Sequence, residues 1–323
     1  MLRRILLYLS DAGWARRLVR NWRLARRVSS RFIAGETLDE ACEVVRRLNQ
    51  KGMYTSLDHL GENVTNTEEA DVARDDYTHM LQRISDTDLQ SNISVKLSQL
   101  GLGVDFERCL YNIHAIVSHA ASLSIMVRID MEDSSTVDRT LEIFRELRHS
   151  GLDNVGLVLQ AYLFRTQEDL NALSPLHAHV RICKGAYNEP AEVAFPRKSD
   201  VDCNFDRLSS QLLDFAKSTA EQTATSGKYP PIPAIATHDE RRIAHAVHHA
   251  ETIEMPKGSI EFQMLYGIRP DLQNRLAESG FPVRVYVPFG SEWYPYFVRR
   301  LAERPANLRF FLSHLVRRKG NES

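Results

Sequence analysis

The segment ISVKLSQLGLGVDFERCLYNIHAIVSHAASLSIMVRID, residues 93–130, has an organisation that recurs through most of the chain. Two short apolar and β-branched runs, at 93–97 and 125–129, flank a stretch of helical periodicity at 105–121. Asp105, a residue type favoured at helix N-caps, begins the helical stretch. The order strand, helix, strand predicts a βαβ unit with two parallel strands.

The same alternation continues through residues 36–323. Further strands are predicted at 54–57, 155–159, 180–183, 234–236, 260–264 and 284–287, and helices at 38–50, 68–84, 137–149 and 205–223. Thr37 and Glu40 have the spacing of a capping box at the first of these helices. Eight βα units favour an α/β fold of the (β/α)8 or TIM-barrel type. A doubly wound open sheet is the alternative, but no G-x-G-x-x-G motif follows the first strand.

Composition and charge narrow the range of functions. The chain is 43% hydrophobic and 26% charged, which is typical of a soluble globular protein with a large core. The formal net charge of -1 gives no reason to expect a nucleic-acid partner. The 4 cysteines lie far apart and form no C-x-x-C pair, so we expect a reducing cytoplasm and neither a zinc ribbon nor a disulfide framework. No apolar run approaches the roughly 20 residues of a membrane span.

The N-terminal segment differs from the rest of the chain. Residues 1–31 contain nine arginines and a single acidic residue, Asp11, which interrupts the initial apolar run. No small-residue cleavage site follows, so we expect no export signal. Apolar residues such as Leu6, Leu9 and Leu18 recur at nearly helical spacing. We therefore expect a basic helical segment at 1–35, followed by a single barrel domain at 36–323. The basic helices either lie on an anionic membrane surface or pack on the barrel with a solvated arginine face.

Polar side chains follow almost every predicted strand. In a (β/α)8 barrel the carboxyl ends of the strands form the active site. One polar residue at such a position means little, because the chain there emerges into water, but so many together predict a convergent polar pocket. They are Asp58, Glu62, Lys96, Gln99, Arg128, Asp130, Glu132, Gln160, Arg181, Lys184, Thr237, His238, Asp239, Gln263 and Tyr286.

The segment RICKGAYNEP, residues 181–190, is the most informative of these strand ends. Arg181 and Lys184 supply two cations, and Gly185 permits a positive φ and the close approach of a ligand. Backbone donors beside two cations suit an anionic or electron-rich ligand. The alternative is that Lys184 and Gly185 form only a turn at the strand exit.

A second informative segment is WYPYFVRRLAERPAN, residues 293–307. Arg299, Arg300 and Glu303 lie within one helical turn and share a face. A pair of arginines can bind a carboxylate with fixed geometry, and the surrounding aromatic residues favour a binding role. A solvated helix face is the alternative.

Histidine positions raise the question of a metal. His238 could be a metal ligand, a general base or a hydrogen-bond donor, with Asp58 and His59 at another strand exit as partners. No preformed ligand spacing supports this, so we expect no metal site. A further histidine cluster lies on the next helix, on the outer ring of the barrel, where a solvated face is expected. Its members are His245, His248 and His249.

Seven segments together resemble the proline dehydrogenase family in its short, monofunctional form. They are VKLSQLG (95–101), VRIDMED (127–133), LQAYL (159–163), RICKGAYNEP (181–190), ATHDE (236–240), EFQMLYGIR (261–269) and VRVYVPFGSEWYPYFVRRLAERPAN (283–307). They follow the family's order and span roughly residues 52–307, one at each strand exit. One such match would be weak, whereas seven in order are specific.

The resemblance implies a distorted barrel that binds FAD noncovalently and oxidises L-proline to Δ1-pyrroline-5-carboxylate by hydride transfer to flavin N5. It implies catalytic roles for Asp130 and Arg181. It places the substrate carboxylate on Lys96, Arg299 and Arg300, and the proline ring against Tyr187, Tyr286 and Ile182, with Glu303 holding an arginine or the ring edge. It assigns FAD contacts to Met131, Gln160, Lys184, Gly185, Ala186, Thr237 and His238, with Gln160 at the flavin's polar edge and Lys184 at the pyrophosphate.

Several finer expectations follow from the same resemblance. Glu62 corresponds to a gate acid that pairs with Arg299, and Asn188 stands where relatives often carry an aromatic residue, which affects packing near the adenylate. Electrons would pass to a membrane quinone, which gives the basic N-terminal segment a role in peripheral contact with the inner membrane. The product would pass to a separate pyrroline-5-carboxylate dehydrogenase.

Overall fold

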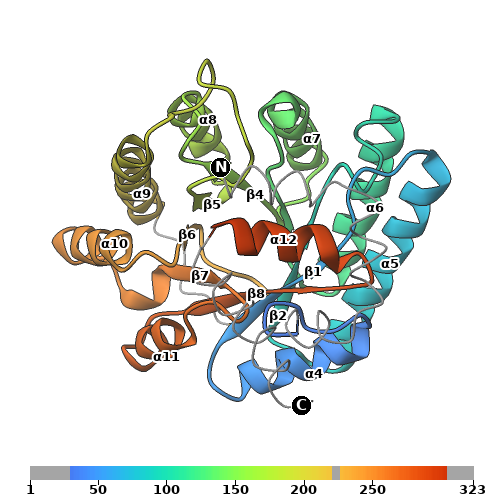
Figure 1. The fold of residues 1–323 in the computed structure, drawn as a ribbon, viewed down its shortest axis with the longest axis horizontal. Helices are drawn as coiled ribbons and strands as arrows, with labels where there is room; N and C mark the ends of the chain where they lie inside the picture. The colour runs from blue at the N-terminus through green and yellow to red at the C-terminus, as the bar shows by residue number, and fades with distance from the viewer. Residues whose placement is uncertain (1–29, 220–225, 304–323) are drawn as a thin grey trace, which may run out of the picture.

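The computed structural model describes residues 30–219 and 226–303, and for residues 299–303 only the backbone. Eight parallel strands close into a barrel in the order β1 to β8 (Figure 1). They are β1 Tyr54–His59, β2 Ser91–Val95, β3 Val127–Ile129, β4 Val155–Gln160, β5 His179–Cys183, β6 Pro233–Ala236, β7 Glu261–Leu265 and β8 Val283–Phe289. The predicted (β/α)8 barrel is therefore confirmed. The basic helices predicted within 1–35 fall almost wholly outside the described residues.

Helices surround the barrel on its outer side (Figure 1). They are α4 Leu38–Asn49, α5 Thr67–Asp86, α6 Phe106–Ser122, α7 Val137–His149, α8 Thr166–Leu173, α9 Lys198–Ser218, α10 Glu240–Thr252 and α11 Pro270–Glu278, with α12 Trp293–Glu303 after the last strand. Short 3₁₀ helices are η1 Ser134–Thr136, η2 Ser174–Leu176 and η3 Lys257–Ser259. Helix α4 contacts β1 and β8 and fills the ring position between α11 and α5. Helix α12, which follows β8, therefore does not occupy a place in this ring of outer helices.

The helix starts follow from their capping residues. Thr37 accepts a hydrogen bond from the Glu40 N–H, and the Glu40 carboxylate accepts one from the Thr37 N–H, so the predicted capping box is confirmed. Asp105 caps α6 by accepting from the Arg108 N–H. Helix α9 begins at Lys198, seven residues before its predicted start, because its first turns are polar and show little apolar periodicity. No helix within the described ranges has an apolar stretch long enough to cross a bilayer.

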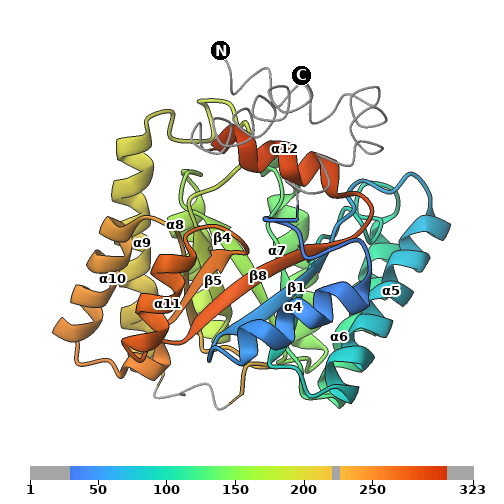
Figure 2. The same ribbon diagram turned by 60° about the horizontal axis from the view of Figure 1, so that its bottom comes forward.

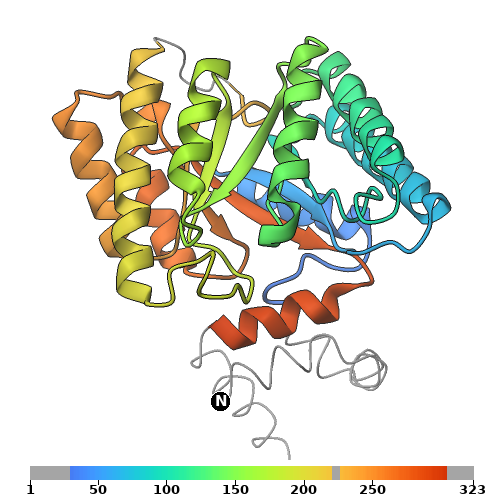
Figure 3. The ribbon, with the colours of Figure 1, turned by 90° about the horizontal axis from the view of Figure 1, so that it is seen from above.

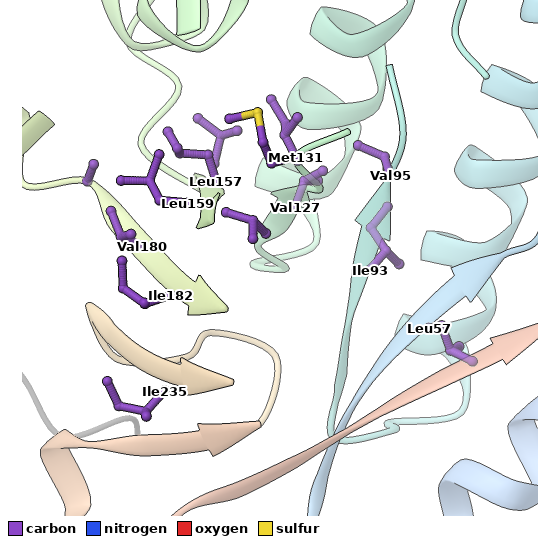
Figure 4. Close-up of a cluster of buried hydrophobic side chains, with 14 of the residues drawn as sticks. Leu57, Ile93, Val95, Val127, Met131, Leu157, Leu159, Val180, Ile182 and Ile235 are labelled. Atoms are coloured by element: carbon purple, nitrogen blue, oxygen red, sulfur yellow. The ribbon is translucent and has the colours of Figure 1, made fainter. Parts of the chain in front are cut away.

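The two faces of the barrel wall differ in chemistry. Apolar side chains such as Leu57, Ile93 and Leu157 belong to one buried apolar cluster between the strands and the helices, part of which is drawn in Figure 4. The alternate residues on the same strands are polar and also buried. They are Ser56, Asp58, Asn92, Ser94, Arg128, Arg181, Glu261, Gln263 and Arg284. The barrel interior is therefore a polar network, and the apolar core lies outside it.

A buried ion pair stabilises the part of this network near the amino ends of β7 and β8. Arg284 Nε and Nη2 donate to the two carboxylate oxygens of Glu261 at 2.8 and 2.9 Å. Arg284 Nη1 also donates to the carbonyl oxygens of Thr55 and Gly227, at 2.5 and 2.7 Å. Both charged residues are at most 1% exposed, so each depends on the other for compensation of its charge.

Helix α12 lies across the end of the barrel toward which the strands point (Figures 2 and 3). Its residues Trp293 and Phe297 pack in one apolar cluster with Phe32, with Leu60 after β1 and with Ile268 after β7. This packing holds the helix that carries residues 299–303 over the mouth of the barrel.

Candidate active site

A cavity of about 860 Å³ opens among the carboxyl ends of strands β2 to β8. Its size is within the usual range for small-molecule and cofactor sites. Every residue proposed above to contact substrate or cofactor or to act in catalysis lines this cavity, with four exceptions. They are Ile182 and the residues whose side chains are not described, Arg299, Arg300 and Glu303. The lining includes Lys96, Asp130, Met131, Gln160, Arg181, Lys184, Gly185, Ala186, Tyr187, Thr237, His238 and Tyr286.

Four expected site residues are not in this group. Ile182 is fully buried in the apolar cluster outside the barrel wall, because it alternates with the inward-facing Arg181 and Cys183 (Figure 4). The expectation that Ile182 contacts the substrate ring is therefore wrong. The side chains of Arg299, Arg300 and Glu303 lie outside the described part of the chain. Their placement, and with it the predicted Glu62–Arg299 gate, stays a prediction.

Asp130 is the hub of the polar groups at the cavity floor. Its Oδ1 accepts a hydrogen bond from Arg181 Nη1 at 2.8 Å, and its Oδ2 accepts one from the Tyr286 hydroxyl at 2.6 Å. Lys96 Nζ lies 3.7 Å from the same Oδ2. Burial, reinforced by the charge of Asp130, raises the pKa of Tyr286 well above 10, so Tyr286 remains a hydrogen-bond donor at neutral pH.

Lys96 is held in place from the opposite side by Asp58. The distance from Lys96 Nζ to Asp58 Oδ1 is 2.8 Å, and both side chains are almost completely buried. Burial alone would lower the pKa of Lys96, but the negative charge of Asp58, reinforced by that of Asp130, raises it well above 10.5. Lys96 is therefore a charged ammonium group inside the barrel.

Arg181 is fixed by three different side chains besides its contact with an aromatic ring. In addition to Asp130, Gln263 Oε1 accepts from Arg181 Nε, and Ser94 Oγ accepts from Nη2 at 3.2 Å. The guanidinium carbon lies 5.5 Å from the centre of the Tyr286 ring. Arg181 thus presents a positive charge of fixed orientation to the cavity.

Gln160 has one unused acceptor. Its amide nitrogen donates to the carbonyl oxygens of Met131 and Glu132, at 3.3 and 3.1 Å. These two bonds determine the orientation of the amide, and the Oε1 atom, although buried, has no hydrogen-bond partner among the described residues. An unsatisfied buried acceptor in a cavity wall suits a ligand with an N–H group.

The loop after β5 approaches the cavity with an unusual backbone. Gly185 has φ +105°, as its predicted role requires, and a Cβ atom there would lie 2.3 Å from the Tyr162 ring. Lys184 Nζ donates to Asp202 at 2.5 Å and to Asp239 at 2.8 Å. Its charge is therefore already shared with two carboxylates, which were not part of the expected pyrophosphate contact.

The histidines do not form a metal site within the described ranges, where no group of three or more potential ligands occurs. His238 Nε2 accepts from the Leu265 N–H at 2.9 Å, which assigns the proton of the neutral ring to Nδ1. His59 stacks on Phe289 with ring centres 5.2 Å apart.

The histidines of α10 correct a second expectation. His245 Nε2 lies 3.0 Å from Ser210 Oγ, and His249 Nε2 lies 2.7 Å from Asp214 Oδ1, so these two contact α9 rather than forming a purely solvated face.

Some cavity residues received no role from the sequence. Gln263 lines the cavity, and Asp58, whose only role considered above was as a metal partner of His238, contacts Lys96 from outside the lining; nothing local indicated that they support Arg181 and Lys96. Lys198 and Arg241 also line the cavity from the starts of α9 and α10. Both residues lie in the first turn of a helix that begins near the strand ends, and this position could have identified them from the sequence. For Lys198, it would have required predicting the correct start of α9.

A closed parallel barrel with a large polar cavity at the carboxyl ends of its strands is the architecture of a (β/α)8-barrel enzyme. The family model for proline dehydrogenase matches residues 41–313. The chain belongs to the proline dehydrogenase family.

Individual relatives agree with this assignment. Proline dehydrogenase 1 of Bacillus subtilis is 39% identical over 98% of this chain and 100% of its own length. Proline dehydrogenase of Deinococcus radiodurans is 37% identical over 98% of both chains. Among solved structures, proline utilization A from Bdellovibrio bacteriovorus, inactivated by N-propargylglycine, superposes with a TM-score of 0.77 at 26% identity. The alignment covers 86% of this chain and 32% of that protein, so this chain spans about a third of its length.

Proposed function

We propose that the chain oxidises L-proline to Δ1-pyrroline-5-carboxylate with FAD as the hydride acceptor, the first step of proline catabolism. The observation that carries the proposal is the group formed by Lys96, Asp130, Arg181 and Tyr286 at the floor of the cavity. This group combines two fixed cations with an aromatic wall, which suits a small amino acid with an apolar ring. Family membership supports the same substrate.

The cavity residues fit FAD on two counts. The unpartnered Oε1 of Gln160 can accept a hydrogen bond from the flavin ring, and Gly185 lines the cavity with a positive-φ backbone that residues with a side chain rarely adopt. We assign the FAD contacts to Met131, Gln160, Lys184, Gly185, Ala186, Thr237 and His238. When bound, FAD supplies the acceptor for the hydride that proline loses.

The substrate carboxylate would be bound by Lys96 together with Arg299 and Arg300, because three cations give short charge-assisted hydrogen bonds to one anion. Tyr187 and Tyr286 would enclose the ring of proline, and Glu303 would orient an arginine of α12. These roles explain why an extra helix covers the mouth of the barrel.

Asp130 and Arg181 would act at the catalytic centre. Arg181 offers a positive charge whose direction is fixed by Asp130, Ser94 and Gln263 before the reaction begins. Preorganised positive charge of this kind stabilises the negative charge that arrives with a hydride.

We further propose that the electrons pass to a membrane quinone, with the basic N-terminal segment making peripheral contact with the cytoplasmic face of the membrane. The product would then go to a separate pyrroline-5-carboxylate dehydrogenase.

An absorbance spectrum tests the central proposal. The purified protein should show flavin absorption, either as isolated or after incubation with FAD, and proline should bleach it in the absence of oxygen. A protein that takes up no FAD, or whose flavin proline leaves oxidised, would refute the assignment.

A further inference from the structure

The loop between β5 and α9, residues 184–197, forms one wall of the cavity through Gly185, Ala186 and Tyr187. Its second half pairs with the loop after β4, which anchors one side of it. The Phe164 N–H donates to the Val193 carbonyl at 3.0 Å, and the Phe195 N–H donates to the Tyr162 carbonyl at 2.8 Å. These two hydrogen bonds involve residues 193 and 195 of the loop and do not attach residues 186–190.

Glu189 provides that attachment. Its Oε1 accepts a hydrogen bond from the Ser134 N–H at 2.8 Å, and its Oε2 accepts one from the Ser134 hydroxyl. The Tyr162 hydroxyl also donates to Oε1, at 3.4 Å. Both carboxylate oxygens are therefore engaged by partners from two other strand exits, those of β3 and β4.

Glu189 and its two partners, Ser134 and Tyr162, lie directly beyond three of the strand ends to which we assign FAD contacts, those of β5, β3 and β4. At each of these strand ends, a residue assigned to FAD contact lies two or three positions before a member of the Glu189 cluster, which consists of Ser134, Tyr162 and Glu189. The pairs are Met131 and Ser134, Gln160 and Tyr162, and Ala186 and Glu189. The Tyr162 ring also packs directly against Gly185. A displacement of the cluster would thus move three FAD contacts together.

We propose that Glu189 is a positioning residue that latches the β5–α9 loop to the loops after β3 and β4 and so sets the shape of the cofactor side of the cavity. It acts through Ser134 and Tyr162 and touches neither the substrate nor the reacting atoms. The inference deepens the proposed function and rests on it for the identity of the ligand.

The test compares E189Q with E192Q, a matched change of an exposed glutamate on the same loop. A glutamine at 189 removes the negative charge and replaces one carboxylate oxygen with an NH2 donor, so it cannot reproduce the two contacts to Ser134, one on each oxygen. From protein loaded with FAD, E189Q should release the flavin about tenfold faster than wild type, while kcat at saturating FAD stays close to that of wild type. E192Q should match wild type. Unchanged release from E189Q would overturn the latch, and so would equal acceleration in both variants.

Hydrogen exchange separates a failure of the latch from a failure of the proposed function, because it needs no flavin. Peptides covering residues 131–136 and 184–193 should exchange faster in E189Q than in wild type or E192Q. S134A, which keeps the backbone donor, should show a smaller change in the same peptides and serves if E189Q does not fold. If the wild type binds no FAD, the function is wrong; if exchange is unaltered in both variants, the latch is wrong.

Discussion

The ammonium group of Lys96 is surrounded by three oxygen-bearing side chains from three strands. Asp58 and Tyr286 lie on β1 and β8, and Asp130 follows β3. Although burial opposes it, the negative charges of Asp58 and Asp130 raise the pKa of Lys96 well above 10.5, so Lys96 is cationic at neutral pH. A substrate carboxylate would therefore meet a positive charge that does not titrate near neutrality.

Arg299→Met tests the proposed second part of the carboxylate site. Loss of one buried charge-assisted contact costs about 2 kcal/mol, so the KM for proline should rise roughly tens- to hundredfold while FAD remains bound. Arg47→Met, at an exposed arginine on α4, is the matched control and should leave KM unchanged. Steady-state kinetics decide the matter, and an unaltered KM in R299M would remove Arg299 from the substrate site.

His179, at the start of β5, should make stability depend on pH. Burial, followed by the charge of Arg128, lowers the pKa of His179 to about 4, from 6.5. Its contribution is complete above pH 6.5, where the ring is neutral in both states. It is lost as the pH falls toward 4, because the unfolded state then takes up a proton that the folded state does not.

Urea unfolding at pH 7 and pH 4.5 measures this contribution. His179 should account for about 2 kcal/mol of the loss in the free energy of unfolding between the two values. H179Q should show a correspondingly smaller loss, whereas H149Q, at an exposed histidine of α7, should behave as wild type. Identical pH dependence in H179Q and wild type would contradict the assignment.

The loop after β5 depends on glycine for two separable reasons. Gly185 has a positive φ, and its Cα lies against the Tyr162 ring. Gly151 also has a positive φ, +81°, but a Cβ atom there would meet nothing within 4 Å. The pair therefore distinguishes backbone strain from steric collision with the ring.

Gly185→Ala should displace the loop and weaken FAD binding by at least about tenfold, because the added methyl group must move the Tyr162 ring or the loop backbone. Gly151→Ala should cost about 1 kcal/mol of stability from strain alone and leave FAD affinity unchanged. Fluorescence titration with FAD gives both affinities. Equal affinities in G185A and wild type would show that the contact is not needed.

The barrel as a whole places its charges inside and its apolar core outside. Glu261 and Arg284 form an ion pair in the barrel interior. The Gln263 amide links this pair to Arg181, because it donates to Glu261 Oε1 at 2.5 Å and accepts from Arg181 Nε. A continuous set of hydrogen bonds thus connects the cavity floor to the opposite end of the barrel. Gln263, which orients Arg181, is thus hydrogen-bonded to the buried Glu261–Arg284 ion pair.

Glu261→Gln should be strongly destabilising, because it leaves the buried guanidinium of Arg284 without a counter-charge. The expected loss is about 3–5 kcal/mol in the free energy of unfolding. Glu43→Gln removes a surface ion pair with Arg46 and should change stability by less than about 1 kcal/mol. Chemical denaturation of both variants checks the difference, and similar values would mean that the interior pair is not compensated as described.

Local patterns were sufficient for the eight strands, for the helices α4 to α7, for the barrel type, for the capping box at Thr37 and for the polar strand exits. Hydrophobic periodicity and capping involve residues only a few positions apart, so they can be followed along one chain. The misplaced start of α9 and the wrong role for Ile182 show the limit of such patterns. A polar first turn carries little periodicity, and the face of a strand residue depends on its register in the barrel.

Which polar residues meet was decided by the closure of the barrel. Lys96 and Asp58 are 38 positions apart, Arg181 and Gln263 are 82 apart, and Tyr286 and Asp130 are 156 apart. The position of α12 over the mouth and the attachment of Glu189 to Ser134 likewise join distant segments. Such contacts have no periodic signature in the chain, because they arise only when eight strands pair in one register and bring their ends to a common cavity.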